Sequence, residues 1–223
     1  MITRRLTGVL AATLLLGSSG AWAQAALDAA RIASAGNGRG APPCATCHGA
    51  NGGGQAAAGY PRLAGLDAAY LNRQVQSFVN GSRSNPVMVA IAKALSDEER
   101  QALSAYYAAM PVPAPAGKDS ASPSDNPVGQ SLAQRGRWSR QVPGCVACHG
   151  PHGVGVGAHF PPLAGQPAAY LASQLTAWQK GTRRNDPLDL MQHVAAALSA
   201  ADIEAVSAWF AAQPATLPGG DTP

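Results

Sequence analysis

The stretch Cys44-Ala-Thr-Cys-His48 decides how this chain is interpreted, and it returns later as Cys145-Val-Ala-Cys-His149. All four cysteines of the 223-residue chain lie in these two stretches. In each stretch two residues separate the cysteines, and a histidine directly follows the second one. Three kinds of site use paired cysteines, namely disulfides, zinc centres and covalent haem attachment.

The spacing of the cysteines favours haem over the other two. A two-residue spacer is typical of a redox disulfide, but thioredoxin-like sites need a βαβ context, which this pattern lacks. A zinc centre made of two such pairs has roughly 12–20 residues between the pairs. Here 97 residues separate Cys47 from Cys145. Covalent c-type haem explains the motif, the trailing histidine and the two occurrences.

The geometry of a helical turn gives the physical reason. Two thiols about one turn apart reach the two vinyl groups on one haem edge, and the next histidine turns its imidazole toward the iron. The motifs therefore predict two covalently bound haem c groups. The predicted attachment residues are Cys44, Cys47, Cys145 and Cys148, and the predicted axial histidines are His48 and His149.

The similarity between the two halves extends beyond the cysteines. The segment Tyr60-Pro-Arg-Leu-Ala-Gly65 matches Phe160-Pro-Pro-Leu-Ala-Gly165 at an offset of 100 residues. Other matches follow in the same order, and the offset rises to 103 in the last matched blocks. This collinear pattern predicts an internal duplication with small insertions in the loops.

Composition divides the chain into four segments. The N-terminus carries Arg4 and Arg5, then a twelve-residue apolar stretch and small residues before Ala23. This predicts a secretory signal peptide, with a retained membrane anchor as the alternative. Five prolines between positions 111 and 127 predict a semi-rigid linker. The predicted segments are the signal peptide over 1–23, a first domain over 24–110, the linker over 111–127 and a second domain over 128–223.

The residue patterns predict an all-α fold. A capping box at Ser96-Asp-Glu-Glu99 begins one helix, Ser199 begins its repeat, and no hairpin signal is present. The other expected helices span 25–35 and 128–140, and 67–82 and 167–180. Twelve aromatic residues are few for two cores of large side chains, so each half is expected to wrap around its haem.

Methionines supply the candidate sixth ligands. Met88 lies 40 residues after His48, and Met191 lies 42 residues after His149. Both are at repeat-matched positions, whereas Met110 has no repeat partner and is predicted to pack in the core. His193 is the alternative ligand for the second iron. The three histidines outside the motifs, His152, His159 and His193, have no histidine counterpart in the first half and are predicted to be loop or surface residues.

Together these features resemble the di-haem cytochrome c4 family. The resemblance covers essentially all of the chain after the signal peptide. It rests on the two Cys-x-x-Cys-His motifs, the repeated Pro-x-Leu-Ala-Gly loop and a methionine before each Leu-Ser helix start. It implies two tandem class I cytochrome c domains, related by a pseudo-twofold axis, that carry electrons in the bacterial periplasm.

The resemblance also implies roles around the haems. Pro61 and Pro161 would each place a backbone carbonyl near Nδ1 of the axial histidine, which is a common way to orient a ligand. Tyr70 and Tyr170, with two repeat-matched arginines, would meet haem propionates, with surface roles as the alternative. One departure concerns the second methionine, which has two extra residues between it and the preceding proline. Its loop is therefore expected to differ in shape and exposure.

The expected function is that of an electron carrier, since iron with histidine and methionine ligands leaves no open position for a substrate. The resemblance implies a quinol–cytochrome reductase or a dehydrogenase as donor, a terminal oxidase or a peroxidase as acceptor, and the membrane surface as an alternative contact. A haem subunit of one dehydrogenase, similar to a flavocytochrome, and a di-haem peroxidase are the other functions considered. No basic stripe with interleaved aromatics is present, which argues against a nucleic-acid partner.

Overall fold

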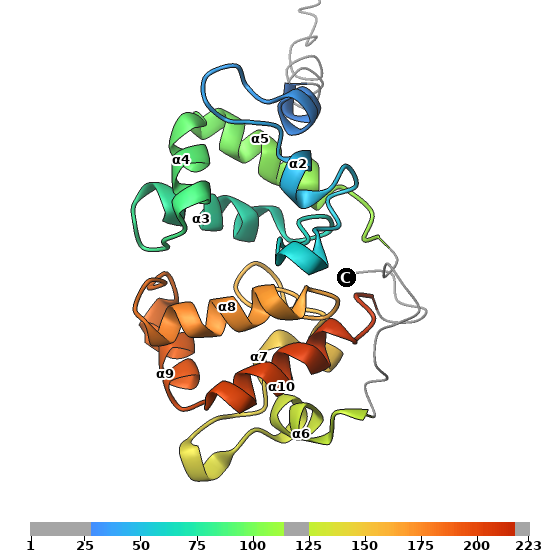
Figure 1. Ribbon diagram of the computed structural model, residues 1–223, viewed down its shortest axis with the longest axis vertical. Coiled ribbons are helices and arrows are strands. Elements are labelled where there is room, and N and C mark those ends of the chain that lie inside the picture. Colours follow the sequence, from blue (N-terminus) through green and yellow to red (C-terminus); the bar gives the residue numbers. More distant parts are fainter. Residues whose placement is uncertain (1–27, 114–124, 217–223) are drawn as a thin grey trace, which may run out of the picture.

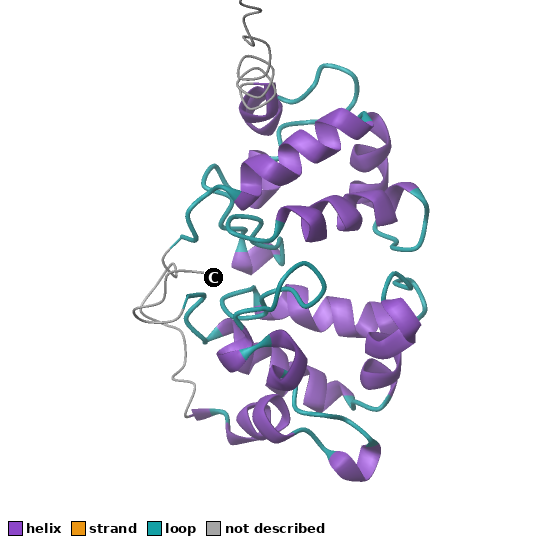
Figure 2. Cartoon of the chain, turned by 180° about the vertical axis from the view of Figure 1, so that it is seen from behind, coloured by secondary structure: helices purple, strands orange, loops and turns teal. Residues whose placement is uncertain are grey.

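The computed structural model describes residues 28–113 and 125–216 of the chain. The predicted signal peptide and residues 114–124 of the predicted linker lie outside the described residues. Within them the regular elements are all helical, and extended pairing is limited to isolated bridges (Figure 2). The all-α prediction is confirmed. The two halves stack end to end along the long axis of the molecule (Figure 1).

Each half repeats the same series of helices. Residues 28–35 are helical, and the first half continues with α2 (Ala45–His48), η1 (Ala56–Ala58), α3 (Ala68–Val79), α4 (Pro86–Ala94) and α5 (Asp97–Ala108). The second half contains α6 (Pro127–Arg135), η3 (Trp138–Arg140), α7 (Val146–His149), η4 (Pro151–Gly153), α8 (Ala168–Gln179), η5 (Pro187–Asp189), α9 (Leu190–Ala196) and α10 (Ala200–Ala211). The order of the helices follows the duplication seen in the sequence.

Local chemistry explains where several helices begin and end. Asp67 caps α3 by accepting a hydrogen bond from the Tyr70 N–H at 2.8 Å, and the predicted capping box is present at Ser96. The first helix of the second half is shorter than predicted. It ends at Arg135 because Gly136 adopts a φ of 71°, where a Cβ would lie 2.2 Å from the Val142 carbonyl oxygen.

The helices that carry the methionines, α4 and α9, are absent from the sequence prediction. The signal for α4 is nonetheless present in the sequence. Asn85 caps the helix by accepting from the Met88 N–H at 3.0 Å, and Pro86 takes the first helical position. In the second half the longer stretch before Met191 contains η5, in which the extra residues Leu188 and Asp189 have φ values of 60° and 54°. The second loop therefore differs in shape from the first.

Each half has its own apolar core. In the first half α3 packs against α4 and α5, and in the second half α8 packs against α9 and α10. Met110 packs against the first core, as predicted. Within residues 28–113 and 125–216, no single helix is long and apolar enough to cross a membrane. One pair, Pro187–Ala196 with Ala200–Ala211, reaches that length only when joined across a bend of 111°.

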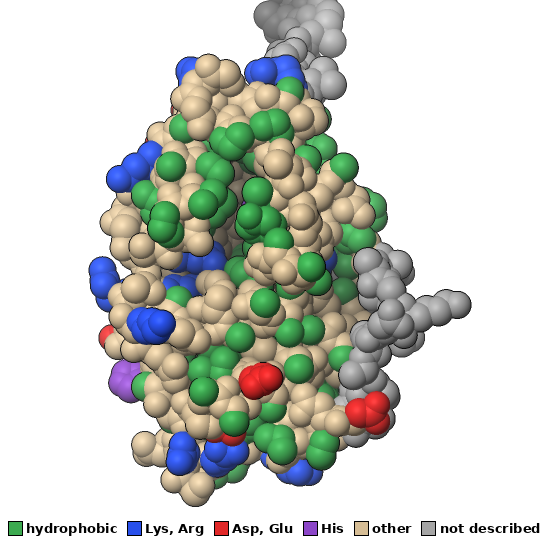
Figure 3. All heavy atoms as spheres, in the orientation of Figure 1, with side chains coloured by type: hydrophobic (Ala, Val, Ile, Leu, Met, Phe, Trp, Pro, Cys, Tyr) green, Lys and Arg blue, Asp and Glu red, His purple; other side chains and the backbone are tan. Residues whose placement is uncertain are grey.

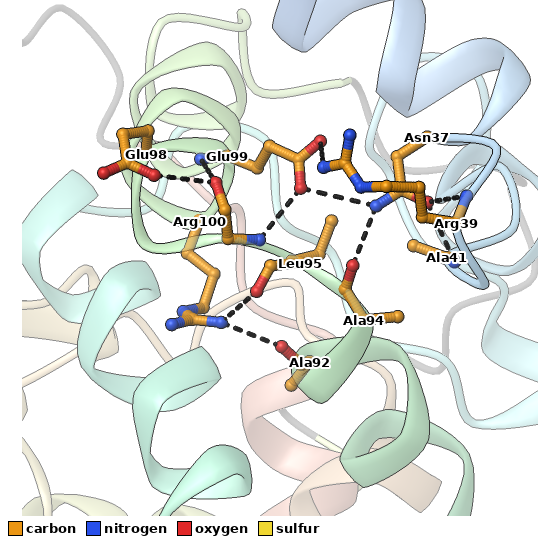
Figure 4. Close-up of polar contacts among 10 residues, drawn as sticks. Asn37, Arg39, Ala41, Ala92, Ala94, Leu95, Glu98, Glu99 and Arg100 are labelled. Carbon is orange, nitrogen blue, oxygen red and sulfur yellow. Dashed lines mark hydrogen bonds and ion pairs between the residues drawn. The ribbon is translucent and has the colours of Figure 1, made fainter.

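Polar contacts tie the loop before each cysteine motif to the last helix of its half. Asn37 donates to the Ala94 carbonyl at 2.8 Å and to Glu99 at 3.3 Å, and Arg39 pairs with Glu99 at 2.7 Å (Figure 4). Arg100 donates to carbonyls at the end of α4, among them that of Ala92 at 3.0 Å. The chain entering the cysteine motif is therefore held in place by side chains as well as by the core.

The contact between the halves has pseudo-twofold symmetry. The Ser84 N–H donates to the Thr182 carbonyl at 2.8 Å, and the Arg184 N–H donates to the Ser82 carbonyl at 2.7 Å. The two bonds join equivalent positions, since Ser84 matches Arg184 and Ser82 matches Thr182 at an offset of 100 residues. The predicted duplication is thus visible both within each half and across the interface.

Candidate haem-binding sites

Each Cys-x-x-Cys-His motif forms one helical turn. The His48 N–H bonds the Cys44 carbonyl at 2.9 Å, and the His149 N–H bonds the Cys145 carbonyl at the same distance. None of the four cysteines forms a disulfide. The turn places two thiols and one imidazole together in each half, which is the arrangement that covalent haem attachment needs.

A proline carbonyl orients each of the two buried histidines. Nδ1 of His48 donates to the Pro61 carbonyl at 2.9 Å, and Nδ1 of His149 donates to the Pro161 carbonyl at 2.8 Å. The proton on Nδ1 leaves Nε2 free to bind a metal. Burial lowers the pKa of both imidazoles, which favours the neutral form that ligates iron.

A large cavity adjoins the second motif. Its volume is about 810 Å³, within the range of about 300–1,000 Å³ typical of small-molecule and cofactor sites. Cys145, Cys148 and His149 line it on one side, and Met191 from α9 also lines it. The remaining walls are mainly apolar, with Leu171, Leu175, Trp178, Val194, Leu198 and Phe210 among them. Thiols, imidazole, thioether and apolar walls together fit a haem.

The first half presents the corresponding residues in the same order. His48 is buried, Met88 is half-buried in the first turn of α4, and Cys44 packs against the first apolar core. Figure 3 shows this half hollowed between apolar side chains. The donor set is therefore the same as in the second half.

The three histidines outside the motifs are all exposed, as predicted. His152 lies in η4 and His159 in the loop before Phe160. His193, the alternative ligand, lies on α9 and lines the second cavity with Met191. Its Nδ1 donates to the Asp189 carbonyl at 2.7 Å.

Two buried arginines meet where the halves touch. Arg83 and Arg183 have only 7% and 5% of their surface exposed, so the surface role does not apply to them. Arg83 donates to the Tyr170 hydroxyl at 2.9 Å and also to Gln174 at 2.6 Å. Arg183 donates to Gln74 and Gln174, each at 3.0 Å. Burial, and then repulsion by Arg83, lowers the pKa of Arg183.

Each of these guanidiniums lies against an aromatic ring of its own half, Arg83 against Phe78 and Arg183 against Trp178. No carboxylate in the described ranges forms an ion pair with either one. Burying unpaired charges costs several kcal/mol each. Gln74 and Gln174, which bridge the arginines, occupy matching positions of the repeat. Sequence reasoning does not place them at an interface, because that depends on the stacking of the halves.

Arg62 makes a second bridge across the interface, and sequence reasoning missed it. Its guanidinium donates to the Ala64 carbonyl at 2.7 Å and to the Ala164 carbonyl at 3.1 Å, which are equivalent positions in the two halves. The Gln166 side chain forms two bonds with the Arg62 backbone, both of 3.0 Å. Only a departure from the repeat, arginine where the second half has Pro162, marks this residue in the sequence.

Comparisons with known proteins agree with this geometry. The cytochrome c family model matches residues 41–110 and 129–212, which fall inside the two predicted domains. A thiosulfate dehydrogenase electron acceptor from Stutzerimonas stutzeri is 57% identical over 75% of this chain and 77% of its own. Cytochrome c4 from Pseudomonas aeruginosa is 38% identical over 82% of this chain and 89% of its own.

Solved structures show the same similarity. Reduced cytochrome c4 from Pseudomonas stutzeri superposes with a TM-score of 0.73 at 33% identity, over 84% of this chain and 98% of its own. The thiosulfate dehydrogenase TsdBA from Marichromatium purpuratum superposes with a TM-score of 0.76 at 45% identity, over 84% of this chain but only 40% of its longer chain. The chain therefore belongs to the cytochrome c family, as a di-haem, cytochrome c4-like electron-transfer protein with two covalently bound haem c groups.

Proposed function

We propose that this cytochrome receives single electrons in the periplasm from a thiosulfate dehydrogenase and passes them to a terminal oxidase or another acceptor. The observation that supports the carrier role is that each half has a histidine oriented by a proline carbonyl and a methionine at the start of a helix. We propose that these two side chains are the axial pair of each iron. The names of two relatives, at 57% and 47% identity, support a dehydrogenase rather than a quinol–cytochrome reductase as the donor.

The proposed site residues have two kinds of role, which are attachment and ligation of the haems and orientation of the axial histidines. Cys44, Cys47, Cys145 and Cys148 are the proposed thioether attachment points, with His48, Met88, His149 and Met191 as the proposed axial ligands. When bound, each haem supplies an iron that changes its charge by one electron. The carbonyls of Pro61 and Pro161 hold the two imidazoles in one orientation, so that Nε2 need not be reoriented when that charge changes.

The buried arginines at the interface support a function in which both halves, with their two haems, act together. The haem groups of this family carry anionic propionates. We propose that Arg83 and Arg183 are the counter-charges of these propionates. Tyr70 and Tyr170 lie beside these arginines, and Tyr170 accepts from Arg83. Two guanidiniums at the interface would then draw both cofactors toward the same contact between the halves.

Reduction by the proposed donor tests the function. The purified protein with both haems is mixed with thiosulfate and a thiosulfate dehydrogenase from Stutzerimonas stutzeri, the source of the 57% identical relative. We expect absorbance changes that correspond to two electrons per chain. Omission of either the enzyme or thiosulfate should leave the protein oxidised. A protein that ascorbate reduces fully and this enzyme does not would contradict the proposed donor.

A further inference from the structure

A loop before the second cysteine motif differs from its equivalent in the first half. Arg137 and Val142 pair through two backbone hydrogen bonds, of 2.7 and 3.2 Å. In the first half the Asn37 N–H donates to the Ala41 carbonyl at 3.1 Å, so that loop is one residue shorter. We call residues 137–142 the Trp138 loop. It lies at the end of the molecule away from the first half (Figures 1 and 2).

The insertion changes the chemistry of the loop tip. The first half has Gly38-Arg-Gly40 between the paired residues, whereas the second half has Trp138-Ser-Arg-Gln141. The Trp138 side chain is 74% exposed. A ring of this size in water is unfavourable by the hydrophobic effect, and nothing in the core or at the haem site uses it. Tryptophan and arginine are the residues most enriched at the energetic centres of protein interfaces.

The loop holds the backbone at Trp138 in a defined position. Residues 138–140 form the short helix η3, and the backbone pairing closes the loop behind it. Arg137 at the base makes two hydrogen bonds with Asp202 of α10, of 2.6 and 2.8 Å. Because the backbone is already ordered, only the side chain has to be ordered when the loop binds a partner, which favours binding.

Two exposed arginines lie close to Trp138 in the chain. Arg135 precedes it by three residues and Arg140 follows it by two, and in residues 28–113 and 125–216 no carboxylate forms an ion pair with either of them. Arg135 donates to the Ser131 hydroxyl at 3.0 Å, and Arg140 reaches the Ala197 carbonyl at 3.4 Å. Figure 3 shows basic side chains at this end, with acidic ones beside them. A partner surface that complements the charge of these two arginines would carry carboxylates.

The loop is continuous with two hollows. A surface pocket of about 290 Å³ lies at its base, lined by Pro127, Val128, Ser131, Leu132, Gly136 and Arg137. On the other side Val142, which pairs with Arg137, lines the cavity that holds Cys145, Cys148 and His149. A molecule bound to the loop would therefore abut the wall of the second haem site.

We propose that the Trp138 loop, with Arg135, is the docking site for the electron donor. The donor would offer an apolar pocket for the Trp138 ring, rimmed by carboxylates that face Arg135 and Arg140. The inference rests on the proposed function and adds to it which half and which residues meet the donor. A protein fits better than a membrane, because the loop adjoins the haem wall and a single tryptophan is not the amphipathic helix typical of membrane-surface binding.

Electron transfer at two salt concentrations tests the docking site. Reduction of the protein with both haems by thiosulfate dehydrogenase and thiosulfate is followed by stopped-flow absorbance for the wild type, Trp138→Ala, Trp138→Phe and Arg140→Gln. Arg31→Gln, at an exposed arginine of the first half, is the matched control. Reduction by ascorbate, which needs no docking site, shows whether each variant retains working haems.

We expect Trp138→Ala to lower the second-order rate constant with the dehydrogenase at least about tenfold, since it removes the interface anchor. Trp138→Phe should retain most of the rate. Arg140→Gln should lower the rate about threefold at low salt and weaken its salt dependence. Arg31→Gln and all ascorbate rates should match the wild type.

Three outcomes would overturn the docking site. An unchanged rate in Trp138→Ala, while the wild type is reduced by the dehydrogenase, removes the docking site and leaves the proposed function intact. If the wild type is reduced by ascorbate but not by the dehydrogenase, both the proposed donor and the docking site are ruled out. The third outcome is co-sedimentation with phosphatidylglycerol-containing vesicles that is lost in Trp138→Ala while the donor rate is unchanged, which would assign the loop to the membrane surface.

Discussion

Arg137 and Asp202 join the loop before the second cysteine motif to the first turn of the last helix through two parallel hydrogen bonds, of 2.6 and 2.8 Å. Asp202 also completes the capping box, since its carboxylate accepts from the Ser199 N–H at 3.0 Å. In the first half, Asn37 and Arg39 donate hydrogen bonds to the Glu99 carboxylate in an equivalent arrangement. Both halves thus fasten their haem-attachment loops to the N-terminus of their last helix.

We expect Asp202→Asn to lower the free energy of unfolding by about 2 kcal/mol, because the buried Asp202 would lose its charged hydrogen bonds to the half-buried Arg137 and the helix its charged cap. Denaturant unfolding of the holoprotein, followed by far-ultraviolet circular dichroism, measures the change. Arg39→Gln is the matched control, since Arg39 is 64% exposed in its ion pair and should cost less than about 1 kcal/mol. Equal losses in both variants would contradict the burial argument.

Acid should weaken the fold through the same carboxylate. Burial alone would raise the pKa of Asp202, but hydrogen bonds from Arg137 and Ser199 outweigh it and lower the pKa below its ordinary value. A lowered pKa in the folded state adds stability that is present at neutral pH and lost as pH falls through the folded pKa. Unfolding free energies measured from pH 6 to pH 2 should therefore decline most steeply below about pH 4. This decline should be shallower in Asp202→Asn, and parallel curves would exclude Asp202 as a contributor.

Removal of each proposed methionine ligand should open one iron at a time. Met88→Ala should allow the reduced first haem to bind carbon monoxide and should lower its reduction potential, while attachment through Cys44 and Cys47 continues. Spectroelectrochemical titration with carbon monoxide challenge measures both properties. Met110→Ala, in the core of the same half, should change neither. An unchanged potential without carbon monoxide binding would show that Met88 is not the ligand.

The same titration of Met191→Ala separates the two candidates in the second half. If Met191 is the ligand, the variant should bind carbon monoxide. His193→Ala should then leave the potential nearly unchanged. A spectrum of the wild type without the methionine-to-iron charge-transfer band, or a large potential change in His193→Ala, would instead assign the second iron to His193.

Arg62→Leu should loosen the contact between the halves. The guanidinium bridges equivalent carbonyls of Ala64 and Ala164, and its loss would leave buried acceptors unpaired, at about 1–3 kcal/mol. Scanning calorimetry should show the halves unfolding at more widely separated temperatures than in the wild type. Small-angle X-ray scattering should show a larger radius of gyration. A single unchanged transition would mean that the other contacts between the halves hold the interface without the Arg62 guanidinium.

The inserted residue Leu188 should be replaceable with a gain in stability. It adopts a φ of 60°, a conformation unfavourable for leucine, and 96% of its side chain is exposed, so little packing would be lost. Leu188→Asn, which tolerates this backbone better, should raise the unfolding free energy by about 0.5–1 kcal/mol. Chemical denaturation measures the gain, and a loss would mean that the leucine makes a contact worth more than the strain.

The sequence predicted the features that depend on local pattern. The haem motifs follow from a spacing of one helical turn, and the duplication from collinear matches between the halves. The capping boxes at Ser96 and Ser199 follow from side chains three residues apart. The helices α4 and α9 were missed because their apolar patterns are short and a proline lies shortly before each methionine.

By itself, the amino-acid sequence determined that this is a two-fold repeated, all-helical protein with two covalent haems, because the groups concerned lie within a few residues of each other in the chain. Only the tertiary structure decided which polar residues meet between the halves. Arg83, Arg183 and Arg62 are buried by stacking of segments about 100 residues apart, and no local pattern encodes that contact. The same holds for the Trp138 loop, whose exposure and position beside the second haem cavity depend on how α6, α7 and α10 pack.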